Sequence, residues 1–169
     1  MDKTKLPFKN MKTYLTRPAS SRRLKDTDYT FPPTTAWDNP IVGVSEQEDD
    51  VWFSYQFLFA DGSRSEASEW DCPEDWWRDW RVPTGNSIAQ VESMHRKFDG
   101  LLMGLKFVGR KGETLVATEL IDKLEFRRNR YVKYRRFTLK ENERLVGVKS
   151  GQRGESDARH HDLQFVIGQ

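Results

Sequence analysis

The chain has 169 residues, of which 32% are charged and 12% are aromatic. This length suits one domain with a tail, and six Trp, ten Phe and five Tyr can build a core in an otherwise polar sequence. The composition argues against global disorder, the single cysteine excludes an internal disulfide, and no apolar stretch approaches the length of a membrane span.

The net charge is only +2, but the charges are unevenly distributed. Residues 1–25 contain eight Lys or Arg and one Asp, residues 123–140 are basic again, and residues 46–79 are rich in acids. Such a field favours docking onto an acidic surface. Because the N-terminus has no apolar run typical of a signal peptide, we expect an intracellular protein, cytoplasmic or cytoskeletal.

Residues 1–36 lack hydrophobic periodicity and contain Pro7, Pro18, Pro32 and Pro33. This composition predicts a basic extended arm that precedes a folded domain over residues 37–169.

The folded domain contains three copies of one strand-loop-strand unit, which begin at Asn39, Asn86 and Glu143. Each copy has an opening strand that ends in Val, a polar loop, and a closing strand that ends in Phe. The Val and Phe positions are Val44 and Phe57, Val91 and Phe107, and Val148 and Phe165. The lengths differ only in the loops, which favours a true repeat over a chance likeness between strands.

Further strands are predicted around each copy. Lead-in strands precede the copies at residues 29–31, 80–82 and 137–139, and strands follow the first two copies at 64–69 and 114–120. A strand near residues 11–15 would complete the third copy, and residues 73–81 could form one or two helical turns. The sequence therefore predicts an all-β domain of three four-strand sheets with a pseudo-threefold repeat.

The third copy runs from a strand through an acidic loop to a strand that ends in an aromatic residue, at Val146-Gly147-Val148, Asp157-Ala158 and Leu163-Gln164-Phe165. In this outline the units resemble those of jacalin-type lectins and of the vitelline membrane outer layer protein family. The resemblance implies a β-prism, with sugar binding through loops at one end. It assigns the sugar contacts to Gly154 and Asp157, although this loop is longer than usual and the first copy lacks a Gly-Gly lead.

The basic stretch 125–140 interleaves cations with aromatic residues and is predicted to form a β-hairpin that turns at residues 127–130. Such a surface could bind acidic protein segments, clamp nucleic-acid phosphates while stacking bases, or be a charged edge strand. Together with the arm it provides the predicted partner-binding residues, which are Arg17, Arg22, Arg23, Lys25, Arg128, Arg130, Lys133, Arg135 and Arg136.

A dense Trp cluster lies before the second copy, with Trp76, Trp77 and Trp80 as candidate interface residues. Exposed Trp is typical of interface anchors, while local packing around an insertion would explain the same cluster.

No feature of the sequence supports an enzyme, a cofactor or a metal. Cys72 has acidic neighbours, which suppress the thiolate. His160 and His161 lie in one loop with Asp157 and Asp162, and adjacent residues there point apart, so we interpret them as solvated polar residues. The chain also lacks the motifs of nucleophile elbows, phosphate loops and paired-Cys zinc sites.

We therefore expect a non-enzymatic structural or scaffold module. It would dock on a larger protein assembly with acidic surfaces, such as a cytoskeletal or ciliary filament, through the arm and the prism surface, without membrane insertion. A jacalin-like carbohydrate-binding lectin is the first alternative, and a nucleic-acid-binding module is the second.

Overall fold

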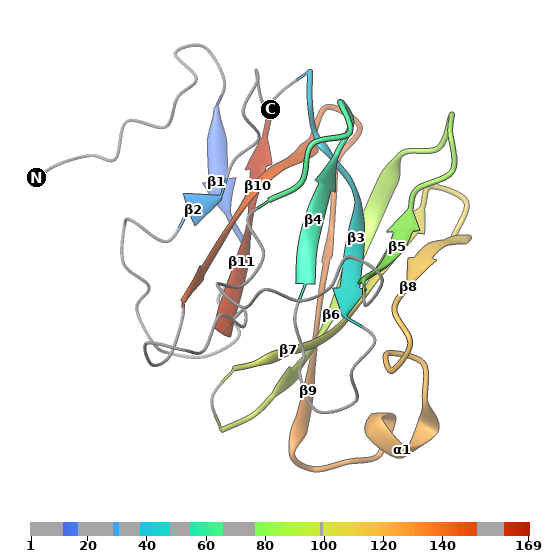
Figure 1. Ribbon diagram of the computed structural model, residues 1–169, viewed down its shortest axis with the longest axis vertical. Coiled ribbons are helices and arrows are strands. Elements are labelled where there is room, and N and C mark those ends of the chain that lie inside the picture. The colour runs from blue at the N-terminus through green and yellow to red at the C-terminus, as the bar shows by residue number, and fades with distance from the viewer. Residues whose placement is uncertain are drawn as a thin grey trace, which may run out of the picture.

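The computed structural model describes residues 12–16, 29–30, 38–47, 55–65, 77–98, 100–151 and 161–169 (Figure 1). These residues form eleven strands and one short helix, α1 (Leu124–Arg127). The strands are β1 (Thr13–Leu15), β2 (Tyr29–Thr30), β3 (Ile41–Gln47), β4 (Tyr55–Phe59), β5 (Trp77–Arg81), β6 (Ile88–Arg96), β7 (Leu102–Gly109), β8 (Thr114–Ala117), β9 (Val132–Thr138), β10 (Arg144–Gly151) and β11 (His161–Gly168).

The strands form three antiparallel sheets, with the orders β1-β11-β10-β2, β4-β3-β5 and β8-β7-β6-β9. Each sheet is built on one central hairpin, β3–β4, β6–β7 or β10–β11, as Figure 1 shows. This arrangement confirms the predicted all-β fold of the β-prism type. In the β3–β4 sheet the fourth position is taken by a single bridge from Leu58 to Arg64, and residues 66–69 of the strand expected there lie outside the described residues.

The strand register shows the threefold repeat directly. In the three central hairpins, Val44 lies opposite Phe57, Val91 opposite Phe107, and Val148 opposite Phe165. Each opening strand also has a register shift just before this Val. The shifts lie between Ile41 and Gly43, Ile88 and Gln90, and Leu145 and Gly147. A β-bulge at the same place in three hairpins is a repeated structural device, because bulges bend a strand and increase its twist.

The three sheets share one apolar core. The six Val and Phe residues of the repeat are at most 2% exposed and belong to the same buried cluster. They reach it because side chains alternate across a strand, so one apolar set from every sheet faces inward. Phe165 contacts Phe57 edge to face, with ring centroids 5.8 Å apart, and Phe137 at 5.5 Å. The sheets therefore stabilise one another around a common interior.

The predicted lead-in strands exist, and each pairs with the opening strand of another copy. β5 pairs with β3, β9 pairs with β6, and β2 pairs with β10. Each lead-in strand thus joins the copy before it, in cyclic order, rather than the copy that follows. This pairing places Trp80 and Phe137 opposite Val44 and Val91, against the core.

The predicted helical turns over residues 73–81 are wrong for the part that the structure describes, because β5 is a strand. Five β5 residues pair with Gly43–Gln47 of β3, and long-range pairing overrides the helical spacing of the Trp residues. Gly43 permits the close approach, since a Cβ there would collide with the backbone oxygen of Trp80. Residues 73–76 lie outside the described part of the chain.

Two short stretches of the predicted arm belong to a sheet. β1 pairs with β11, as the predicted strand near residues 11–15 required, and β2 pairs with β10. The hydroxyl of Thr16 also accepts a hydrogen bond from the Phe165 amide at 2.9 Å. A side-chain hydroxyl plays the same role after the outer strand of the other two sheets. The Ser65 hydroxyl accepts a hydrogen bond from the Phe57 amide, and the Thr118 hydroxyl accepts one from the Leu105 amide. The domain boundary between residues 36 and 37 stays a prediction.

Candidate functional site

One end of the prism collects the turns of the central hairpins. β3, β6 and β10 end there, and β4, β7 and β11 begin there (Figure 1). The β6–β7 turn is described apart from residue 99, whereas residues 48–54 and 152–160 of the other two connections lie outside the described residues. α1 and the start of β9 lie at the same end (Figure 1).

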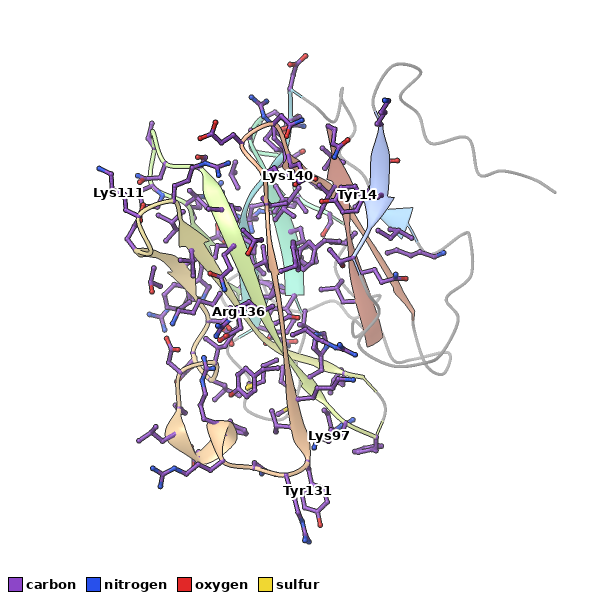
Figure 2. The ribbon with its side chains drawn as sticks, turned by 180° about the vertical axis from the view of Figure 1, so that it is seen from behind. Tyr14, Lys97, Lys111, Tyr131, Arg136 and Lys140 are labelled. Atoms are coloured by element: carbon purple, nitrogen blue, oxygen red, sulfur yellow. The ribbon has the colours of Figure 1, made fainter. Side chains whose placement is uncertain are left out.

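This end exposes large apolar side chains. Phe98 in the β6–β7 turn is 76% exposed, Leu124 in α1 is 68% exposed, and Tyr131 before β9 is 59% exposed. Tyr131 lies at the lower extremity of the molecule, beside Lys97 (Figure 2). The Lys97 amide donates a hydrogen bond to the Tyr131 carbonyl oxygen at 2.9 Å, which joins the two segments.

Arginine side chains stack on both exposed rings. The guanidinium carbon of Arg96 lies 4.4 Å from the ring centroid of Phe98, and that of Arg130 lies 4.8 Å from the ring of Tyr131. Arg130 also donates to the Tyr131 hydroxyl at 2.7 Å. We call this surface the aromatic tip, and define it by Arg96, Lys97, Phe98, Leu124, Arg128, Arg130 and Tyr131.

His95 holds the turn that carries Phe98. This side chain is 1% exposed, and the tautomer that fits both of its contacts donates from Nδ1 to the Gly100 carbonyl oxygen at 3.3 Å and accepts from the Ser93 hydroxyl at 2.7 Å. Burial lowers the pKa of His95 to about 4, and the positive charges of Lys133 and Arg135 act in the same direction. His95 is therefore a neutral structural residue, which the sequence reasoning did not identify.

α1 is held on the outer face of its sheet by ion pairs of Arg127 and by apolar contacts of Phe126. Glu92 is almost fully buried and accepts from Arg127 with one oxygen and from Arg136 Nη2, at 2.7 Å, with the other. Burial alone would raise the pKa of Glu92, but the hydrogen bonds from the two Arg outweigh it and lower the pKa. Arg127 also stacks on Tyr134 at 4.3 Å. These contacts fix the position of Leu124.

The predicted hairpin over residues 125–140 is wrong, because its first half is α1 and only its second half is a strand, β9. β9 is an edge strand, as one of the interpretations proposed. The side of β9 that carries Lys133 and Arg135 also carries Phe137, which packs against the core. That side therefore faces inward and does not form an open surface for stacking bases.

The predicted basic residues consequently separate into groups. Arg128 and Arg130 lie in the aromatic tip, Lys133 and Arg135 lie near buried His95, and Arg136 pairs with Glu92. The predicted residues outside the described part of the chain are Arg17, Arg22, Arg23, Lys25, Trp76, Gly154 and Asp157.

Trp80 packs between the core and a buried carboxylate. Its Nε1 donates to Glu46 Oε2 at 3.1 Å, and Arg78 stacks on its ring at 4.3 Å. Trp77 is partly buried in the same strand. Burial raises the pKa of Glu46, while its hydrogen bonds from the Glu119 amide and Trp80 act in the opposite direction. Trp80 is thus held within the fold rather than offered on an open surface.

The described residues contain neither a metal-binding cluster nor a membrane-spanning helix. No three His, Cys, Asp or Glu side chains gather there in a way that could hold a metal ion. No helix in the same part of the chain is long and apolar enough to cross a membrane. Cys72 and His160 lie outside it.

Comparison with known proteins gives a result only at the level of structure. No protein-family model and no curated protein matches the chain. Calystegia sepium agglutinin is similar with a TM-score of 0.50 and 10% identity, over 94% of this chain and 97% of that one. A mannose-binding lectin from champedak has a TM-score of 0.46, 14% identity and coverages of 92% and 94%. A prostate-specific WGA16 glycoprotein lectin has a TM-score of 0.48 and 15% identity, over 92% of this chain and 89% of that one.

The comparison corrects the expected function. The scaffold module on a cytoskeletal or ciliary assembly is wrong, because the solved structure that shares this fold is that of an agglutinin. Acidic protein partners are not supported either. The likeness to the Calystegia agglutinin shows the fold, which is the jacalin-like β-prism.

Proposed function

We propose that this chain is a carbohydrate-binding protein of the lectin type and not an enzyme. The observation that carries the proposal is the β-prism itself, which the chain shares with Calystegia sepium agglutinin over 94% of its length. Function is carried by a site on the fold, so the proposal also requires residues that bind sugar.

The sequence resemblance supplies that site. It assigns sugar contacts to Gly154 and Asp157, which lie in the chain between β10 and β11 outside the described residues. The described ends of these strands meet at the Gly151–His161 pair, so the connection starts from the end of the prism where the central hairpins turn. Carboxylate and backbone groups there would bind sugar hydroxyls, which need both donors and acceptors.

A glycan array probed with the full chain tests this proposal. We expect retention on a defined class of glycans and a loss of at least about fivefold for Asp157→Ala, since one unpaired sugar hydroxyl removes about 1–3 kcal/mol. Glu141→Ala is the matched control. Glu141 is an exposed carboxylate in the β9–β10 connection, beside Lys140, at the opposite end of the prism from Tyr131 (Figure 2). No retention of any glycan, or equal losses for both variants, would reject the proposal.

A further inference from the structure

The aromatic tip exposes three large apolar side chains that the proposed sugar site does not include. Its three large apolar side chains are 59–76% exposed, so they project from the molecule. The turns described at the opposite end, residues 60–63, 110–113 and 140–143, expose no large apolar side chain. Projecting apolar groups gathered at one end mark an interaction surface.

Cations outnumber acids in the two segments that carry these side chains. Residues 96–100 and 123–131 contain six cations, Arg96, Lys97, Lys123, Arg127, Arg128 and Arg130, and two acids, Asp99 and Glu125, which gives 6 − 2 = +4. Arg127 is engaged with Glu92 and Asp122. Arg96 and Arg130 stack directly on the projecting rings, and Lys97 adjoins Phe98 in the chain.

We propose that the aromatic tip docks this chain on an anionic phospholipid surface. Phe98, Leu124 and Tyr131 enter the boundary between headgroups and acyl chains, and the surrounding cations contact headgroup phosphates. An interfacial surface of this kind combines apolar groups that penetrate by several ångströms with Lys and Arg at headgroup level. A guanidinium stacked on an inserted ring lies at the depth of the headgroups, where it can contact a phosphate while it remains on the ring.

A protein partner fits the surface less well. Interface anchors are enclosed in pockets of the partner and surrounded by a rim of polar contacts, whereas here cations are interleaved with separate projecting side chains. A bilayer needs no shape complementarity, and it satisfies apolar and cationic groups at the same time. Hydrogen bonds from the Lys97 amide to Tyr131 and from His95 to Gly100 hold the segments that carry Phe98 and Tyr131 in place.

Vesicle flotation with the full chain tests the proposal. The vesicles are phosphatidylcholine alone, or phosphatidylcholine with phosphatidylserine, and neither carries carbohydrate. We expect binding to the second kind only, weakening as salt rises because the attraction is screened. The test is thus independent of the proposed glycan binding, and its failure would leave that proposal untouched.

Two variants and one matched control locate the surface. Lys97→Glu should weaken vesicle binding on the order of tenfold, because each cation near such a surface contributes roughly fivefold and the substitution also adds repulsion. Phe98→Ser should weaken it by about tenfold through lost apolar insertion. Lys111→Glu makes the same charge change in the β7–β8 turn at the opposite end (Figure 2) and should have little effect. Circular dichroism would show that all three remain folded.

Three results would overturn the proposal. Equal flotation with neutral and anionic vesicles would remove the role of the cations, and no flotation with either would remove the membrane. Binding to a soluble sulfated polysaccharide that depends on Lys97 but not on Phe98, without vesicle binding, would assign the surface to acidic polymers instead.

Discussion

Phe57 and Phe165 meet edge to face at the centre of the prism, with ring centroids 5.8 Å apart and ring planes at 85°. They come from the closing strands of the first and third copies, so this contact joins the beginning of the repeat to its end. Both rings are at most 2% exposed. The contact depends on three sheets packing together, because no single sheet could bury both rings.

Phe165→Ala should therefore destabilise the whole domain. Removing a buried Phe typically costs about 3–5 kcal/mol, through lost apolar burial and the cavity that remains. Urea unfolding would measure the loss. Phe98→Ala is the control and should change the free energy of unfolding by less than about 0.5 kcal/mol, because Phe98 is 76% exposed. Equal effects of the two substitutions would contradict a shared core.

The core could be predicted from the sequence because its signal is local. Apolar alternation within a strand gives the inward side, and the recurrence of Val and Phe gives the register of Val44 with Phe57 and of its two equivalents. The partners of the lead-in strands could not be predicted, since pairing across more than thirty residues leaves no local pattern. For the same reason the helical spacing of Trp77 and Trp80 was misleading: pairing with β3 decides their conformation.

The candidate site was predicted only in part. Arg128 and Arg130 were identified because clusters of cations are visible in a sequence, and the structure adds the rings beside them. Phe98 and Leu124 were missed, because an apolar residue is expected inside until its exposure is known. His95 was missed since its role depends on Gly100 and Ser93, which fold around it.

Glu92→Gln should reduce stability by about 2 kcal/mol near neutral pH, because it leaves Arg127 and Arg136 without their shared carboxylate. The lowered pKa of Glu92 means that this contribution is complete above its ordinary value of 4.5 and is lost as the pH falls through the lowered pKa. Unfolding curves of both proteins should therefore converge in acid. Asp122→Asn, at an exposed ion pair with Lys106, should lose only about 0.5 kcal/mol. A difference between wild type and Glu92→Gln that persists in acid would refute this account.

His95 should make the domain less stable in mild acid. Its pKa falls from 6.5 to about 4 on folding, so the unfolded chain binds the proton more readily between these values. Stability is complete above pH 6.5 and decreases by at most about 3 kcal/mol as the pH falls to about 4. NMR titration of the imidazole should give a midpoint near 4, and His95→Gln should remove the stability change within this window. A midpoint near 6.5 would show that His95 is not buried.

Tyr14→Phe should loosen β1 from the sheet that contains β10 and β11. The Tyr14 hydroxyl donates to Glu143, which also accepts from the Lys140 amide and from Gln169. Burial and then Glu143 raise the pKa of Tyr14 to about 12. Loss of this hydrogen bond should cost about 1–2 kcal/mol in thermal or urea unfolding.

Tyr131→Phe removes the same atom at the exposed tip and serves as the control. Its hydroxyl accepts a hydrogen bond from the exposed Arg130 side chain, so we expect almost no change in stability. If Tyr14→Phe were equally neutral, the hydroxyl would not anchor β1.

The central claim is that the β-prism binds a glycan at the end where its central hairpins turn. NMR titration of the full chain with the best glycan from the array measures this directly, by the backbone amides whose signals shift. We predict shifts at this end, including Gly151 and His161 where β10 and β11 meet, and none at Lys111 or Gly112 in the opposite turn. Shifts confined to the opposite turn, or saturating glycan with no shifts at all, would contradict the claim.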